Sequence, residues 1–401
     1  MSSPSDAVEG PRILLTAGKG GVGKTTVAAA TAALCAARGP RVLVMSIDSA
    51  HNLSDLFGVP LGPTPTPLAE RLHGLEVDLN GELRANWHSV IDFFRTMTAN
   101  DPRVTDVVAE ECAVLPGMEE VFGLMRLQSV VESGKFDVIV VDAPPTGDLL
   151  KFLRLPDVVH WFMGRYRPLE RGLLQRMRPV TEAMGWPLPP EEAVAEMEQW
   201  YARVRQCGAT LTDSRRVSVR LVMTPDRVGL AETQRAFTWT SLLGMNVDAV
   251  IVNRLLPAAG LPPSFQRWAE KQSAVLAAAE GAFSSVPVLR AEQQPDEVLG
   301  AAALKAFGAS LYGERDPAGL WSAEPPVQWT ERPGSAELRL RLPFLKKGAF
   351  RLLSGPDGLT LHVENQRRLV PLPAAVRHRS MRRARYEDGW LRVEYGPAEG
   401  E

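Results

Sequence analysis

The sequence contains few cysteines and no long uninterrupted apolar segment. Its three cysteines, Cys35, Cys112 and Cys207, lie far apart and form no C-x-x-C pair. This spacing argues against a disulfide framework and a thiolate zinc site, so we expect a reducing, cytoplasmic environment. No segment reaches the roughly 20 apolar residues of a membrane-spanning helix, and residues 1–10 lack the basic and apolar regions of a secretory signal. The sequence therefore predicts neither secretion by that route nor a membrane span.

The sequence also has little excess charge of either sign. Its 45 basic and 47 acidic residues give a formal net charge of -2. A nearly neutral chain argues against duplex nucleic acid as an electrostatic partner. Hydrophobic residues make up 45% and charged residues 23% of the 401 positions, which is typical of a globular protein. The length favours two domains.

Short apolar runs recur along the first three quarters of the chain, with helical stretches between them. They occupy residues 12–17, 41–47, 136–142, 217–224, 248–253 and 286–289. Continuous rather than alternating apolarity is typical of strands that are covered on both faces. We therefore predict an α/β fold with a doubly wound parallel sheet.

Two helical insertions interrupt this pattern, at about 85–130 and 155–210. Large apolar side chains recur there at helical spacing, as in the set Met197, Trp200, Tyr201 and Val204. These faces either pack on one another within a helical subdomain or form a hydrophobic groove for a client. Methionine and tryptophan in the second insertion fit an adaptable apolar surface.

The C-terminal quarter has a different pattern. Residues 313–333 are rich in proline and predict a linker. Residues 334–396 alternate between apolar and polar side chains and contain Gly-rich turns, so we predict a small all-β sandwich. The basic run 377–385 indicates either nucleic-acid binding or a solvated strand edge or loop, and we favour the edge or loop because basic residues protect strand edges.

The segment "GKGGVGKTT" at 18–26 fits the phosphate-loop pattern G-x-x-x-x-G-K-[ST] and follows a predicted strand. Its backbone N–H groups would surround the phosphates, Lys24 would neutralise β and γ oxygens, and the Thr25 hydroxyl would ligate Mg²⁺. We predict a nucleoside triphosphate site formed by Gly18, Gly20, Gly21, Val22, Gly23, Lys24, Thr25 and Thr26.

Carboxylates follow two other predicted strands. Asp142 ends the run 136–142 and is predicted to act on Mg²⁺ through water. Asp48 comes directly after the run 41–47 and is predicted to orient the attacking water or accept its proton, with Asp55 as the alternative. Asp137, near the start of the run 136–142, is interpreted as a solvated turn residue. His51 and Asn52 are either switch residues or caps of the next helix.

Six motifs carry a resemblance to a known family. The motifs "KGGVGKTT", "DSAHNLSD", "LPGMEE", "DAPPTGDLLKFLRLP", "TPDRVGLAET" and "VIVNRLLP" occur in this order within residues 11–312. Together they resemble the ArsA family, which includes arsenite-pump ATPases and the ATPases of guided entry of tail-anchored proteins. The resemblance extends the ATPase domain over 1–312. It implies ATP hydrolysis with Mg²⁺ by a homodimer whose subunits face each other across two nucleotides.

The same resemblance implies roles for residues that the phosphate loop alone does not explain. Lys19 would reach the partner's nucleotide, where an added cation stabilises the charge that develops on the transferred phosphate. Asn253 would contact the adenine, the loop from Pro287 to Arg290 would lie near it, and residues 145–147 would form a second switch.

The chain departs from the family pattern at three places. Ser49 stands where the family commonly has proline, and Asp148 stands where it commonly has histidine, so the detailed coupling of the switches can differ. The segment after "VIVNRLLP" contains no cysteine, which excludes the zinc clasp that eukaryotic members of the targeting branch place there.

The few cysteines also bear on the function. Arsenite binding needs clustered thiolates, and only Cys112 and Cys207 lie in or near the helical insertions, which argues against an arsenite site.

The segments "LRLRLP", "GLTLHVENQRRLVPLP" and "YEDGWLRVEY" are similar to the α-crystallin domain of small heat-shock proteins. We therefore expect a targeting factor or chaperone whose ATP cycle opens and closes a groove for a tail-anchored helix or other apolar client, with a membrane receptor as a further partner. The alternatives are an arsenite-transport ATPase subunit, a partitioning or regulatory ATPase, and a passive holdase that binds through its β domain.

Overall fold

The structure is a computed structural model that divides into two compact units. One unit comprises residues 1–75, 136–150 and 211–401, and the other comprises residues 76–135 and 151–210. The structure describes residues 10–48, 52–78, 81–82, 92, 118–145, 191–257, 260–322, 324–345, 348, 350–355, 358–363 and 366–398.

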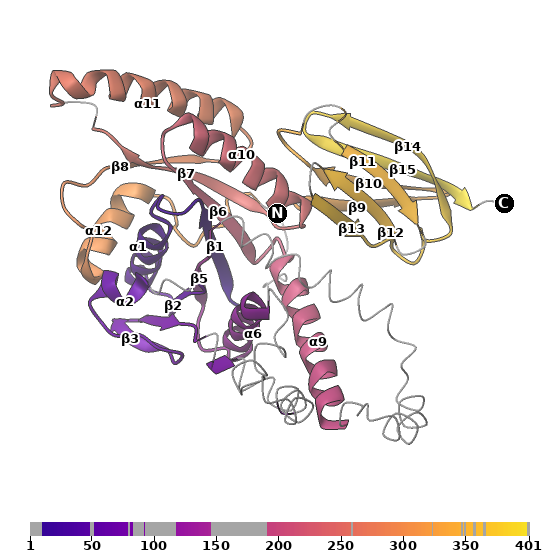
Figure 1. Cartoon of the computed structure of the whole chain (residues 1–401), viewed down its shortest axis with the longest axis horizontal. Helices are drawn as coiled ribbons and strands as arrows, with labels where there is room; N and C mark the ends of the chain where they lie inside the picture. The colour runs from indigo at the N-terminus through magenta and orange to yellow at the C-terminus, as the bar shows by residue number, and fades with distance from the viewer. Residues whose placement is uncertain are drawn as a thin grey trace, which may run out of the picture. The chain divides into compact units, whose positions relative to one another are not determined.

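A sheet of eight strands forms the centre of the larger unit (Figure 1). Its order is β3-β4-β2-β5-β1-β6-β7-β8, and the strands are β1 Arg12–Gly18, β2 Val42–Ser46, β3 Thr66–Ala69, β4 Leu72–Glu76, β5 Val138–Asp142, β6 Val217–Met223, β7 Val247–Leu255 and β8 Val288–Glu292. All neighbours from β2 to β8 are parallel, which confirms the predicted doubly wound sheet. The antiparallel pair β3–β4 was not predicted, because β3 has only four residues.

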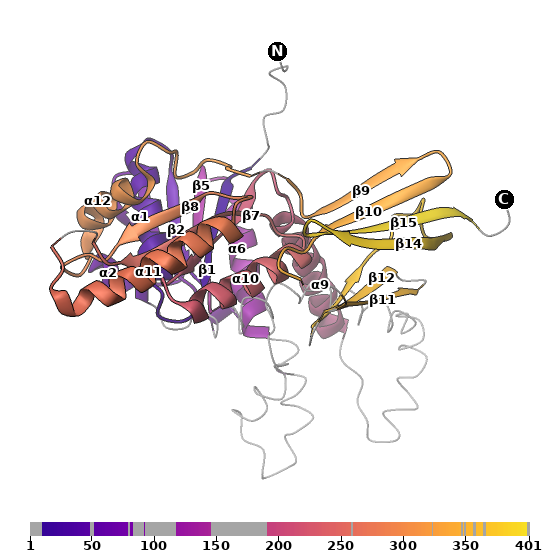
Figure 2. The ribbon, with the colours of Figure 1, turned by 90° about the horizontal axis from the view of Figure 1, so that it is seen from above.

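Helices cover both faces of this sheet (Figures 1 and 2). Helix α1 (Lys24–Ala37) and helix α12 (Gly300–Tyr312) bury the face that presents Leu14 and Val140. Helices α10 (Arg227–Leu242) and α11 (Pro263–Ala282) lie on the other side. The small side chains of α1 let α12 approach closely, and a Cβ at Gly308 would lie 2.6 Å from the Ala30 carbonyl oxygen.

The strand order has a switch point at β1. Strand β1 pairs with β5 on one side and with β6 on the other, so the chain reverses its direction across the sheet at β1. Ligands of open α/β sheets bind outside the carboxyl ends of the strands at such a switch point. The topology therefore places the expected site residues at the ends of β1, β2 and β5 near one another.

The smaller unit contains helices where the insertions were expected. Helix α6 (Met118–Glu132) and helix α9 (Glu191–Leu211) contact each other, and the Thr210 hydroxyl donates to Gln128 Oε1 over 2.9 Å. Val204 is fully buried, as its predicted helical face requires. Most of the apolar positions that predicted a client groove, including all of 85–91 and 155–190, lie outside the described residues.

The C-terminal region forms two antiparallel sheets around one apolar cluster, which confirms the predicted all-β architecture. One sheet has the order β14-β15-β10-β9 and the other β11-β12-β13; the strands are β9 Val327–Arg332, β10 Ser335–Arg341, β11 Phe350–Gly355, β12 Gly358–Val363, β13 Gln366–Val370, β14 Arg379–Glu387 and β15 Trp390–Ala398. Most of the basic run 377–385 lies on the edge strand β14, whose central residues are exposed, so the favoured strand edge is confirmed.

The stretch 313–333 is expected to be a linker, but much of it pairs with a strand or packs against the central sheet. Strand β9 occupies its last part and pairs with β10. Its first part contacts the central sheet, because the buried Arg220 guanidinium donates to the Pro317 carbonyl oxygen over 2.6 Å and stacks on Trp321. No helix among the described residues is long and apolar enough to cross a membrane.

Candidate nucleotide site

Two glycines fix the path of the phosphate loop between β1 and α1. A Cβ at Gly18 would lie 2.3 Å from the Val222 carbonyl oxygen on β6, so only glycine allows β1 to end this close to β6. Gly23 is the N-cap of α1 and has a φ of 92°, where L residues are strained. The loop therefore has the form that brings backbone N–H groups and the start of a helix to one point, where phosphate oxygens bind.

Asn253 supports this loop from β7. Its side chain is 6% exposed, and its Nδ2 donates a hydrogen bond of 2.8 Å to the Val22 carbonyl oxygen. The structure thus gives Asn253 a contact with the loop itself. The adenine contact expected of Asn253 stays a prediction.

The other loop residues begin α1. Lys24 is 6% exposed, and its Nζ donates to the Lys19 carbonyl oxygen over 3.3 Å, so the ammonium group lies within the curve of its own loop. Thr25 and Thr26 are half-buried in the first turn. Gly20 and Gly21 are exposed at the loop's tip.

Asp142 ends β5 beside this loop and is completely buried. It is in register with Thr16 on β1 and with Ser46 on β2. Neither carboxylate oxygen accepts a hydrogen bond of ordinary geometry from the described groups, although the Thr25 and Ser46 hydroxyls lie near enough to lower the pKa of Asp142. The pKa of Asp142 is raised to about 7, chiefly by burial and also by the Asp48 charge, and these outweigh the lowering by the Thr25 and Ser46 hydroxyls and the Lys24 ammonium.

A buried carboxylate without a partner is costly, and a bound cation would relieve that cost. Mg²⁺ prefers hard oxygen ligands, and the Thr25 hydroxyl and the Asp142 carboxylate supply them at one place. The residues present therefore fit a magnesium ion. When bound, that ion would neutralise charge on the phosphate oxygens.

The structure distinguishes the two carboxylates considered for water activation. Asp48 follows β2, and its backbone N–H donates a hydrogen bond of 3.2 Å to the Ser46 hydroxyl oxygen. Its charge contributes to the raised pKa of Asp142, so the two carboxylates are near each other. Asp55 is exposed on the short helix α2 (Asn52–Phe57), and Asp137 forms an exposed ion pair with Arg41.

Several expected residues are placed elsewhere or lie outside the described part. Pro287 precedes β8, where its carbonyl oxygen accepts from the Val250 N–H, three strands from β1 and so roughly 14 Å across the sheet. Its expected position near the adenine stays a prediction. Asn52 begins α2. His51 and residues 146–147 of the expected second switch lie outside the described residues.

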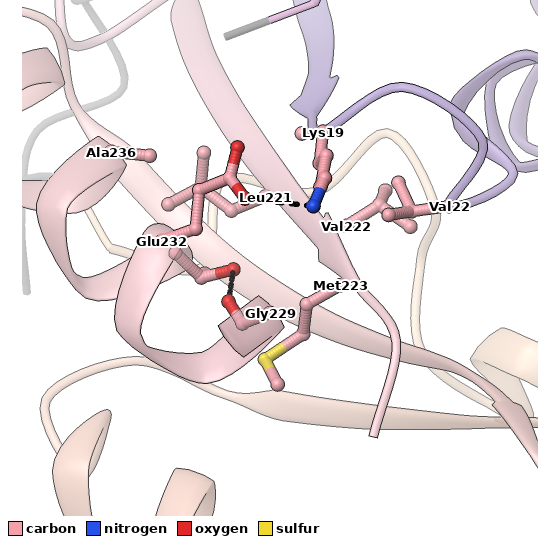
Figure 3. Close-up of a pocket in the computed structure, with 10 residues that line it drawn as sticks. Lys19, Val22, Leu221, Val222, Met223, Gly229, Glu232 and Ala236 are labelled. Atoms are coloured by element: carbon pink, nitrogen blue, oxygen red, sulfur yellow. Dashed lines mark hydrogen bonds and ion pairs between the residues drawn. The ribbon is translucent and has the colours of Figure 1, made fainter. Parts of the chain in front are cut away.

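Glu232 was missed by the sequence analysis. Its Oε2 lies 3.8 Å from Lys19 Nζ, across a small cavity between the loop and α10 that Gly18, Val222, Gly229 and Ala236 also line (Figure 3). The only sequence signal for it was its place in "TPDRVGLAET". Its proximity to the loop depends on β6 pairing with β1, which one motif does not reveal.

The described cysteines are unsuited to binding soft metals. Cys35 and Cys207 are both buried, and burial raises the pKa of each thiol to about 12. Within the described ranges, no group of three His, Cys, Asp or Glu side chains could hold a metal ion. Cys112 lies outside those ranges.

Comparison with known proteins agrees with the fold. Residues 11–313 match the model of the anion-transporting ATPase family ArsA, and residues 333–395 match the HSP20-like domain that is found in ArsA proteins. The chain is 35% identical to a protein of Chlorobaculum tepidum named as an arsenical pump-driving ATPase, over 96% of each chain. It is 26% identical to the ATPase get3 of Schizosaccharomyces pombe, over 74% of this chain and 90% of the yeast protein. An ASNA1-homologous ATPase of Trypanosoma cruzi is 27% identical over 76% of this chain and 91% of its own.

Proposed function

The chain belongs to the ArsA ATPase family and is an ATP hydrolase, and from this we propose that it works as a Mg²⁺-dependent homodimer that handles an apolar client. The observation that carries the catalytic part is the buried Asp142 carboxylate without a described partner next to Lys24 and Thr25. Such a group is stabilised when a cation joins it to the phosphates of a nucleotide.

Each loop residue then has a separate task in the proposal. Lys24 binds the phosphates of its own subunit's ATP, Thr25 and Asp142 hold Mg²⁺, and Asp48 orients the attacking water. Lys19 acts on the nucleotide of the partner subunit. This last assignment is supported by exposure, because the Lys19 side chain is 55% exposed whereas Lys24 is buried in the loop.

The proposed client is a hydrophobic helix, such as that of a tail-anchored protein, which the helical unit would bind in one nucleotide state and release in another. Support comes from the family and from the get3 and ASNA1-homologous relatives. Of the helical unit itself, α6 and α9 are described, and they pack together. A cytoplasmic location and a membrane receptor belong to the same proposal. We take the C-terminal β domain as an accessory to client binding.

A variant that binds ATP without hydrolysing it tests this function. Asp48→Asn protein loaded with ATP and Mg²⁺ should retain a tail-anchored helix peptide that the ADP-loaded protein releases. A peptide with its apolar residues replaced by serine serves as the control. Loss of turnover without any nucleotide-dependent retention would leave the ATPase assignment standing and contradict the client.

A second candidate, an ATPase that responds to arsenite, is favoured by the name of the Chlorobaculum tepidum relative. The two described thiols argue against it, because each is held in its protonated form by burial. Addition of antimonite or arsenite to the purified protein tests it. We expect ATP turnover to stay unchanged, and a stimulation that Cys112→Ser removes would favour this second candidate instead.

A further inference from the structure

Lys19 faces helix α10 and not the centre of its own phosphate loop. Its ammonium group and the Glu232 carboxylate point toward each other across the small cavity (Figure 3), with 3.8 Å between Nζ and Oε2. Lys24, five residues later, lies within the loop's curve and donates to the Lys19 carbonyl oxygen. The two lysines of one loop therefore point to different places.

Both sides of this contact are fixed by the fold. Gly18 pairs with Val222 on β6, and a Cβ at Gly18 would lie 2.3 Å from the Val222 carbonyl oxygen, so the start of the loop is held against β6. Helix α10 is fixed at its start by Asp226, whose carboxylate accepts from the Gly229 N–H over 2.8 Å and from the Thr224 hydroxyl over 2.6 Å. Glu232 is in the second turn of this helix, and its side chain is only 29% exposed.

Asp226 adds negative charge at the N-terminus of the same helix. Burial raises its pKa, but the hydrogen bonds from Thr224 and the N-terminal N–H groups of α10 outweigh burial and lower it, with a contribution from the nearby Lys19 ammonium. Asp226 therefore interacts with the Lys19 charge only at longer range, and the structure shows no ion pair between these two described residues. Glu232 is the residue whose ion pair with Lys19 the structure shows.

The ion pair between Lys19 and Glu232 is weak enough to be broken by a competing anion. Lys19 is 55% exposed, and ion pairs of this exposure change an equilibrium by only about two- to fivefold. A triphosphate carries several negative charges and so competes well against a single carboxylate for one ammonium group.

We propose that Glu232 is a positioning residue that holds Lys19 against α10 in a single subunit and releases it to a phosphate of the partner's nucleotide when two subunits meet. This inference rests on the proposed trans role of Lys19. Its consequence is that Glu232 opposes dimer formation at low ATP, so that the lysine is engaged only when both nucleotides are present.

The test measures dimerisation of the full chain by mass photometry against the concentration of a non-hydrolysable ATP analogue with Mg²⁺. Glu232→Gln should lower the half-maximal concentration about two- to fivefold, because the competing charge is gone. Glu232→Asp keeps the charge and should stay closer to wild type. Glu314→Gln, an exposed acid just after α12, is the matched control and should leave the concentration unchanged.

A double variant separates positioning from a structural effect. In a Lys19→Ala background, Glu232→Gln should have no further effect on the half-maximal concentration. An equal shift in both backgrounds, or an unchanged or raised concentration for Glu232→Gln alone, would overturn the inference. Failure of the wild-type protein to dimerise at any analogue concentration would instead contradict the proposed function.

Discussion

The Asn253 side-chain amide donates a hydrogen bond of 2.8 Å to the Val22 carbonyl oxygen, so strand β7 holds the phosphate loop that follows β1. The two strands are not neighbours, because β6 lies between them. Asn253 thus connects the end of a distant strand to the loop. Any shift of β7 would be transmitted to the phosphate-binding backbone.

Removal of this amide should weaken nucleotide binding. Asn253→Ala leaves the Val22 carbonyl oxygen without its donor, which costs about 1 to 2 kcal/mol and should lower ATP affinity roughly tenfold. Gln272→Ala is the control, since it removes a side-chain contact to the Leu256 N–H near the same end of β7. Titration with a fluorescent ATP analogue measures both. Similar losses in the two variants would contradict a specific role for Asn253.

Replacement of Asp142 should raise the free energy of unfolding but lower the activity. Asp142→Asn removes a buried charge without a described partner, so the metal-free protein should gain about 1 to 3 kcal/mol in free energy of unfolding at pH 8. The same variant should lose Mg²⁺-dependent turnover. Urea unfolding in EDTA and a turnover assay are the measurements, and a less stable metal-free variant would contradict the account of this carboxylate.

The pH dependence of stability follows from the same group. The pKa of Asp142 is about 7 in the folded chain, against an ordinary value of 3.8. Between these values the folded state binds more protons than the unfolded state, so this group makes the free energy of unfolding fall as pH rises from about 4 to 7. Asp142→Asn should make that fall less steep in urea titrations with EDTA. An unchanged slope would show that Asp142 ionises normally in the folded chain.

The sequence predicted which residues lie together wherever one motif follows one strand. The proximity of the phosphate loop, Asp48 and Asp142 could be predicted because a parallel sheet brings the carboxyl ends of its strands together. Glu232 could not be found, since its contact with Lys19 requires the pairing of β1 with β6, more than 190 residues apart in sequence. Strand β9 was missed because the prolines before it favoured a linker.

The burial and pairing of charged residues inside the central sheet also could not be predicted from the sequence. Asp248 is completely buried and accepts from Arg12, Arg220 and the Ser218 hydroxyl. The apolar run around it predicted only a strand. Its partners come from β1 and β6, and which strands are neighbours is decided by the tertiary fold.

Loss of this buried carboxylate should destabilise the protein strongly. Asp248→Asn leaves Arg12 and Arg220 without their shared counter-charge and should cost about 3 to 5 kcal/mol in free energy of unfolding. Asp137→Asn breaks the exposed pair with Arg41 and should cost no more than about 1 kcal/mol. Urea unfolding compares them, and equal costs would contradict the importance of burial.

The two lysines of the loop should differ in what their loss impairs. Lys24→Ala removes the ammonium group from within the loop and should reduce ATP affinity together with turnover. Lys19→Ala removes a group that points away from the loop, so it should spare ATP binding and reduce turnover. Isothermal titration and a turnover assay separate these effects. Equal losses of affinity would show that Lys19 is a phosphate ligand within its own loop.

The central claim is that each catalytic site is completed by Lys19 of the other subunit, and mixing two inactive variants tests it most directly. In a heterodimer of Lys19→Ala and Asp48→Asn chains, one site has an intact Asp48 and receives an intact Lys19 from its partner. An equal mixture should therefore recover about a quarter of wild-type ATP turnover, although each variant alone has almost none. No recovery, in a mixture shown by mass photometry of size-tagged chains to contain heterodimers, would mean that Lys19 acts on its own subunit's nucleotide.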